Sequence, residues 1–142
     1  MINETIRWKS RYNGDFHPKY IEFIELISKA KNLREEKVFD VEFFMFFTAK
    51  FVKLFDGFIR VMKEYLQYKG IFQVTHREVI KECFSNEIIF DGQDWINMLY
   101  DVERLERAIP TKDDIDLIIG KYFDLITKMY EYFEKNRVHN GR

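Results

Sequence analysis

The sequence predicts an all-α protein, folded as a mostly antiparallel four-helix up-and-down bundle with one additional short helix. Long stretches place apolar residues at three- and four-residue steps, the spacing that lines one face of a helix. Only 6 Gly and 2 Pro interrupt these stretches, whereas 46% of the chain is hydrophobic and 15 Phe and 8 Tyr supply large core side chains. At 142 residues the chain has the usual length of one domain, so residues 1–142 are expected to form a single bundle with loose ends at 1–14 and 136–142.

Caps and periodicity predict the first two helices. Asp15 offers an N-cap and Pro18 suits a first helical turn, which predicts a helix over residues 16–31. From residue 39 or 40 to residue 68 no proline occurs, so this segment is expected to form the central long helix, ended by the lysine and glycine at 69–70. Its apolar seam is predicted at Phe43, Phe47, Phe51, Phe55, Phe58, Met62 and Tyr65.

Three further helices are expected in the second half of the chain. Thr75 lies three residues before Glu78, the arrangement of a capping box, so a short helix is expected to begin just after Thr75. A fourth helix opens at residue 91 or 92 and runs to about 107, and after Pro110 the cap Thr111 begins a last helix that continues to about 135. The predicted buried residues of the short helix and its connector are Val79, Ile80, Cys83, Phe84, Ile88, Ile89 and Phe90.

The charge balance and the lone cysteine disfavour several classes of protein. A net charge of −1 gives no field that would draw in nucleic acid or an anionic membrane, so neither partner is expected. Cys83 has no partner for an internal disulfide and lies in an amphipathic segment, which favours a small buried hydrophobe over a nucleophile. Because the N-terminus lacks the apolar core of a signal peptide, and no apolar run reaches about 18 residues, a cytoplasmic location is expected.

The run THREVIKECFSNEIIFDGQDWINMLYD, from Thr75 to Asp101, resembles the nucleotidyltransferase substrate-binding proteins, a branch of the HEPN superfamily. The likeness extends from IRWKSRY near the N-terminus to KYFDLITKMYEYFEK, and it is specific over residues 65–101. It implies a helical bundle that forms a homodimer and binds a separate small nucleotidyltransferase. That partner would carry the Gly-Ser and D-x-D motifs and would hold the nucleoside triphosphate and Mg²⁺, so no cofactor is expected in this chain.

Many proteins of this superfamily cleave RNA with an Arg, four intervening residues, a His, one residue and a Tyr, directly after the run. The corresponding residues here are Val102, Arg107 and Ile109. A valine cannot steady a phosphate, and an arginine does not exchange a proton at cellular pH. Ile109 also lacks the hydroxyl that a partner would nucleotidylate. The chain is therefore not expected to be an enzyme.

Asp114 and Asp116 have the D-x-D arrangement by which nucleotidyltransferases hold Mg²⁺. The residues upstream, 107–110, contain no Gly-Ser pair for a triphosphate, and acidic residues at a helix start complement the positive end of the helix dipole. No His or Cys pair occurs at ligand spacing. We therefore interpret these aspartates as helix-stabilising residues and expect no metal site in this chain.

Polar residues on two helices are candidates for a functional surface. Asp56 and Arg60 are spaced i, i+4 on the central helix and Lys63 follows one turn on, while Arg104 and Arg107 are candidates to join them as a small basic patch. The alternative is a solvated face with ordinary helix-stabilising pairs. The candidate partner- or substrate-binding residues are Asp56, Arg60, Lys63, Asp101, Arg104 and Arg107.

The apolar arc of the central helix is wider than one seam in its first half, which indicates cover from more than one side. A second subunit would supply that cover at Phe43, Phe46 and Phe47, and the alternative is that the bundle itself encloses them. The leading functional hypothesis is a non-catalytic adaptor that binds a small nucleotidyltransferase and helps to form or regulate its substrate site. The alternatives are a HEPN-type ribonuclease toxin of a toxin–antitoxin pair, which the missing motif disfavours, and a structural helical homodimer.

Overall fold

The computed structural model describes residues 13–136, and the predicted loose ends at 1–14 and 136–142 fall mainly outside this range. Residues 13, 14 and 136 belong to helices. The described part contains helices and no strand, which confirms the all-α prediction. In chain order the elements are α2 (Asn13–Glu35), α3 (Val41–Tyr68), α4 (His76–Ser85), α5 (Gly92–Leu105), α6 (Lys112–Leu117), a π-helical turn η1 (Ile118–Tyr122) and α7 (Phe123–Asn136).

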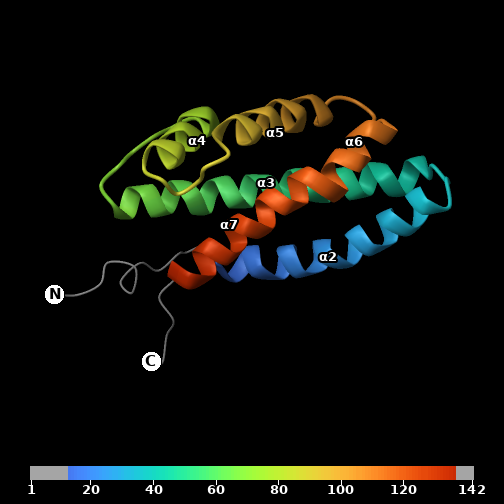
Figure 1. Ribbon diagram of the computed structural model, residues 1–142, viewed down its shortest axis with the longest axis horizontal. Helices are drawn as coiled ribbons and strands as arrows, with labels where there is room; N and C mark the ends of the chain where they lie inside the picture. Colours follow the sequence, from blue (N-terminus) through green and yellow to red (C-terminus); the bar gives the residue numbers. More distant parts are fainter. Residues whose placement is uncertain (1–12, 137–142) are drawn as a thin grey trace.

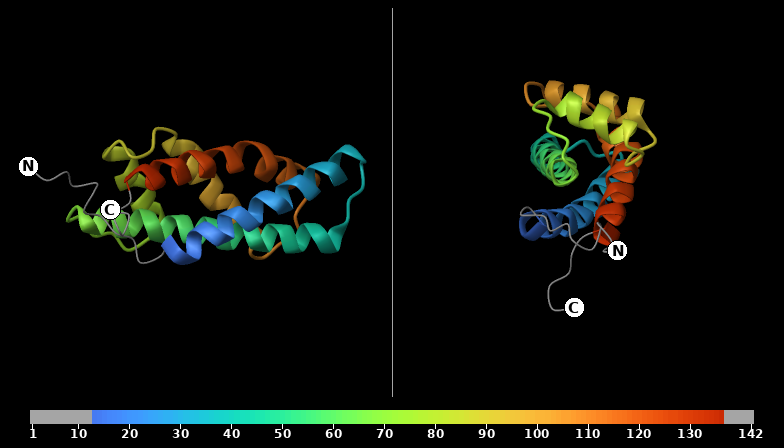
Figure 2. Two further views of the ribbon diagram at one scale, coloured as in Figure 1. Left: turned by 90° about the horizontal axis from the view of Figure 1, so that it is seen from below. Right: turned by 90° about the vertical axis from the view of Figure 1, so that its left-hand side faces the viewer.

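The bundle is arranged around α3 (Figure 1). Helix α2 lies along one side of α3, α4 and α5 lie along the opposite side, and α6, η1 and α7 follow a single path across a third side (Figure 2). The long elements run in alternating directions and α4 is the additional short helix, so the predicted up-and-down arrangement is confirmed. Within the described residues, no helix covers the side of α3 that faces away from α7 (Figure 2).

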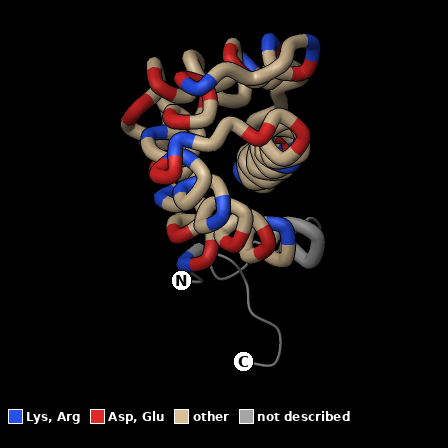
Figure 3. Tube along the Cα trace, turned by 90° about the vertical axis from the view of Figure 1, so that its right-hand side faces the viewer, with Lys and Arg blue, Asp and Glu red and all other residues tan. Residues whose placement is uncertain are grey.

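Basic and acidic positions are interspersed over the described surface rather than gathered by sign (Figure 3). This distribution fits the nearly neutral net charge of the chain. No helix among residues 13–136 is long and apolar enough to cross a bilayer.

Helix α3 ends where the sequence predicts, at Tyr68, and begins at Val41, within two residues of the predicted start. Its N-cap, Asp40, accepts a hydrogen bond of 3.0 Å from the Phe43 amide. At the other end Gly70 adopts φ +85°, and the Ile71 amide donates to the Leu66 carbonyl at 2.8 Å, which closes a Schellman turn. The apolar side chains of α3 in the core are Phe44, Phe47, Phe51, Leu54, Phe55, Phe58, Ile59, Val61, Met62, Tyr65 and Leu66.

Helix α2 is longer than predicted at both ends. It begins at Asn13, so the expected N-cap at Asp15 is wrong and Pro18 lies inside the helix rather than in its first turn. It ends at Glu35 because Leu33 packs against the core and extends the stripe of Ala30 by one turn. Its buried face meets α7, where the Tyr20 hydroxyl and Thr127 Oγ1 are 3.0 Å apart.

The capping box of α4 is confirmed. Thr75 Oγ1 accepts from the Glu78 amide at 3.1 Å, and Glu78 Oε1 accepts from the Thr75 amide at 3.2 Å. The Thr75 amide, followed by its hydroxyl, lowers the pKa of Glu78, because both hydrogen bonds favour the ionised carboxyl. Buried Val79, Ile80 and Cys83 also match the prediction, and burial raises the pKa of the Cys83 thiol to about 12, which keeps it protonated and unreactive.

Two aromatic side chains around α4 are not buried as predicted. Phe84 is 52% exposed and Phe90 is 75% exposed, whereas Ile88 and Ile89 alone hold the connector against the core. The Phe84 ring covers Gly92, where an added Cβ would lie 2.8 Å from Phe84 Cδ1. A glycine is therefore needed at the start of α5 because the ring occupies the space of a side chain.

The last helix follows the predicted path with two local differences. Thr111 caps α6 as predicted, and Asp114 completes an additional capping box. The path is interrupted by η1, a π-helical turn that the periodicity did not reveal. Gly120 lies within this turn, and its low helix propensity favours a local departure from α-helical geometry.

Candidate functional site

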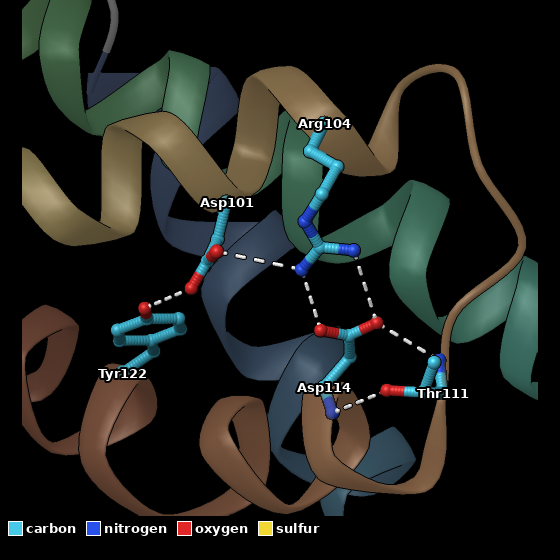
Figure 4. A network of polar contacts seen from close by, with 5 residues as sticks. All are labelled: Asp101, Arg104, Thr111, Asp114 and Tyr122. Atoms are coloured by element: carbon cyan, nitrogen blue, oxygen red, sulfur yellow. Dashed lines mark hydrogen bonds and ion pairs between the residues drawn. The ribbon is translucent and has the colours of Figure 1, made fainter.

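A network of five polar side chains joins α5 to α6 and η1 (Figure 4). The Arg104 guanidinium donates to both carboxylate oxygens of Asp114, at 2.6 and 3.3 Å, and to Asp101 Oδ1 at 3.4 Å. Asp114 Oδ2 also accepts from the Thr111 amide at 2.8 Å, and the Tyr122 hydroxyl donates to Asp101. The network therefore ties the end of one helix to the start of the next.

The protonation of this network is fixed by its contacts. Burial of Asp114, which is 7% exposed, raises its pKa, but the hydrogen bonds from Arg104 and Thr111 outweigh burial and leave the pKa below its ordinary value. Burial, followed by the hydrogen bond to Asp101, raises the pKa of Tyr122, so the phenol stays protonated and donates. Asp101 and Arg104 thus bind partners within the chain.

The two aspartates of the D-x-D pair, Asp114 and Asp116, each form an ion pair with a different arginine. While Asp114 binds Arg104, the Asp116 carboxylate accepts from Arg34 of α2 at 2.7 and 3.0 Å. No group of three or more His, Cys, Asp or Glu side chains within residues 13–136 is arranged to hold a metal ion. Both carboxylates therefore serve in ion pairs between helices, one to α5 and one to α2.

The candidate residues on α3 lie near the start of α4. Asp56 Oδ1 is 3.4 Å from His76 Nε2, so it pairs with α4 and not with Arg60 as the i, i+4 spacing suggested. Arg60 and Lys63 line a groove of about 330 Å³ between the two helices, and His76 also lines it. Asp56, Arg60 and Lys63 are thus close together, and His76 joins them from a part of the chain that sequence spacing does not connect.

Arg107 lies apart from the other candidates. It follows the end of α5 and lines a second groove of about 550 Å³, between α3 and the loop 106–110. Because the Arg104 guanidinium is held by two aspartates and Arg107 lies in this groove, the two do not form the predicted basic patch. Of the other two ribonuclease-motif positions, Val102 is buried in the core and Ile109 is 62% exposed in the same groove.

Sequence reasoning missed Thr48, which lines the groove of Arg107. Thr48 is 3% exposed, and its Oγ1 is the one buried side-chain nitrogen or oxygen in the described part of the chain without a hydrogen-bond partner. A threonine inside a helix often donates to the carbonyl four residues before it, and Thr48 does not. The only sequence signal is a hydroxyl within an otherwise aromatic stretch.

The predicted dimer residues differ in their accessibility. Phe47 is wholly buried and stacks on Phe23 with ring centroids 5.0 Å apart, so placing it in a dimer interface is wrong. Phe43 is half-buried beneath Lys29, whose Nζ lies 4.7 Å from the ring centroid. Phe46 is 48% exposed, which leaves it as the accessible member of the three.

Comparison with protein-family models, with curated proteins and with solved structures gives no match for this chain. The class that the fold defines is an all-α helical bundle.

Proposed function

We propose that this chain is a non-catalytic adaptor that binds a separate small nucleotidyltransferase and helps to form or regulate its substrate site. The observation that supports it most is the run from Thr75 to Asp101, which resembles the substrate-binding partners of such enzymes. The nucleoside triphosphate and Mg²⁺ would belong to the nucleotidyltransferase. The adaptor contributes by positioning groups across the interface, and it acts in the cytoplasm.

The groove between α3 and α4 is the surface that we assign to the partner. Arg60 and Lys63 line it, and neither has an acidic partner among the described residues. Cations of this kind, exposed or half-buried on a helix, suit the acidic surface that surrounds a metal-dependent transferase site. His76 lies at the edge of the same groove and pairs with Asp56.

Co-purification tests the adaptor role. The chain is expected to co-elute with the product of an adjacent reading frame that encodes Gly-Ser followed by D-x-D. Reversing charge with Arg60→Glu and Lys63→Glu is expected to weaken this complex at least about tenfold, because two rim charges become repulsive. Lys128→Glu, at an exposed position on α7, is the matched control and is expected to leave it unchanged. Two purified proteins that never co-elute would refute the proposal.

We also propose that the chain forms a homodimer through the uncovered side of α3. Val41 and Phe46, near the N-terminus of the helix, are 43% and 48% exposed. Large apolar side chains on a face that no helix of the described part covers favour an interface between like copies. Phe46→Glu is expected to give a monomer with unchanged helicity in sedimentation experiments, and the equally exposed Phe84→Glu on α4 is the control. An unchanged oligomer in Phe46→Glu would contradict the dimer.

A further inference from the structure

The groove between α3 and the loop 106–110 has the dimensions of a small-molecule site. Its volume of about 550 Å³ falls within the range of ligand pockets in proteins, roughly 300–1,000 Å³. Its lining is mainly apolar, and the apolar side chains come from both walls: Met45, Ala49 and Val52 from α3, and Ala108, Ile109 and Pro110 from the loop. Such a lining suits the apolar body of a ligand.

Two cations in the groove have no acidic partner. Most arginines of the described part are bound within the chain: Arg34 by Asp116, Arg77 by the Tyr100 hydroxyl, and Arg104 by Asp101 and Asp114. By contrast, the side chains of Lys53 and Arg107, which line opposite walls of the groove, make no hydrogen bond or ion pair within residues 13–136. Glu106 is the single acid of the lining, so the groove carries an excess of one positive charge.

The floor of the groove holds the unsatisfied hydroxyl. Thr48 Oγ1 is buried without a partner, although a hydroxyl in such a position usually finds one, and leaving it unpaired is unfavourable. Thr48 itself lines the groove, so this hydroxyl lies at its wall. A bound molecule with a polar atom at this depth would supply the missing hydrogen bond.

We propose that this groove binds a small molecule that combines an apolar body with an anionic group, a carboxylate or a phosphate ester. Its apolar body contacts Met45 and Ile109, its anion lies between Lys53 and Arg107, and a polar atom near the body meets the Thr48 hydroxyl. The arginine guanidinium suits both anions because it presents two parallel donors. The inference does not depend on the proposed adaptor role.

Binding of 1-naphthyl phosphate to the full chain tests this site, because the compound joins an aromatic body to an anion. Isothermal titration calorimetry is expected to show saturable binding to one site per chain. Amide chemical shifts are expected to change at residues 45–53 and 105–109 and not along α7. The two halves of the probe, 1-naphthol and inorganic phosphate, are expected to bind at least about tenfold more weakly, since each lacks one class of contact. Absence of saturable binding, or shifts confined to other surfaces, would overturn the proposal.

Substitutions that change the charge or the shape of the groove should change the affinity for the probe in a pattern that non-specific binding would not show. Arg107→Gln is expected to weaken binding about tenfold and Glu106→Gln to strengthen it about threefold, because one removes an attractive charge and the other a repulsive one. Ala49→Phe fills the groove and is expected to abolish binding with unchanged far-UV circular dichroism, while the control Lys128→Gln binds as the parent chain does.

Equal affinities across these variants would refute the site. A second pair of results would also refute the site: the parent chain is a dimer that binds no probe, and Ala49→Phe turns that dimer into a monomer. The groove would then be filled by a second copy of the chain. Loss of probe binding and loss of co-elution with a nucleotidyltransferase are separate measurements, so either proposal can fail alone.

Discussion

Thr48→Val is expected to stabilise the protein, because it replaces a buried hydroxyl that has no partner with a methyl group of similar size. An unpaired buried hydroxyl costs about 1–3 kcal/mol, and we take the lower end because Thr48 lines an open groove. A gain of about 1 kcal/mol in the free energy of unfolding raises Tm by roughly 3–5 °C for a domain of this size. Thermal unfolding followed by circular dichroism measures the change.

The matched control is Thr127→Val, the same substitution at a hydroxyl that has a partner. Thr127 Oγ1 lies 3.0 Å from the hydroxyl of Tyr20, whose side chain is 6% exposed. Losing that hydrogen bond is expected to destabilise the protein by about 1 kcal/mol and to lower Tm by a similar few degrees. The two variants should therefore move in opposite directions. A fall in Tm for both would show that the Thr48 hydroxyl has a partner in solution, and the reasoning would be wrong.

Four other outcomes are expected. Asp114→Ala should lower the free energy of unfolding by about 2 kcal/mol, since it removes half of the α6 capping box and the main partner of the exposed Arg104 side chain, whereas exposed Asp113→Ala should change it by less than about 0.5 kcal/mol in urea denaturation. The folded-state pKa of Asp114 lies below its ordinary value, so the stability that the ionised carboxylate contributes is complete above the unfolded pKa and is lost as pH falls through the folded pKa. Below about pH 4 the Tm of Asp114→Asn should consequently fall less than the Tm of the parent chain. Parallel curves of Tm against pH for the two chains would contradict the lowered pKa of Asp114. Gly70→Ala should destabilise by about 1 kcal/mol because φ is +85°, and Glu87→Gly should stabilise by about 0.5 kcal/mol because Glu87 holds φ 59°; a change of the opposite sign in chemical denaturation would contradict the prediction for that variant. Total RNA incubated with the chain without metal should stay intact on a gel, and cleavage that disappears in Arg107→Ala would reverse the view that the chain lacks nuclease activity.

Features with a local physical cause could be predicted from the sequence. The Thr75 box needs only the spacing to Glu78, and the bounds of α3 need only a cap, a glycine and an unbroken apolar period. Apolar periodicity was less reliable for predicting whether a given side chain is buried, because apolar residues at the edge of a helix's apolar face can be either buried or exposed. Phe84 covers a glycine at the surface, while Phe47 belongs wholly to the core.

The contacts of the candidate sites depend on tertiary placement, which no local pattern encodes. Asp56 has a basic residue at i+4 and nevertheless pairs with His76, since the start of α4 lies beside it. Likewise Tyr122 reaches Asp101 across 21 residues of sequence. The orphaned hydroxyl of Thr48 could not be foreseen either, because a missing hydrogen bond is a property of the finished packing.

The ion pair between Arg104 and Asp114 has a consequence for the loop that it spans. The two residues are 10 apart in sequence, and the segment between them contains residues 106–110, which form one wall of the larger groove. Because the segment is short and the contact at its ends has two hydrogen bonds, the ion pair removes much of the segment's conformational entropy. The wall is therefore preorganised, and a molecule that enters the groove has little loop entropy to suppress. Breaking the ion pair between Arg104 and Asp114 should therefore weaken ligand binding in the groove, although neither residue lines it.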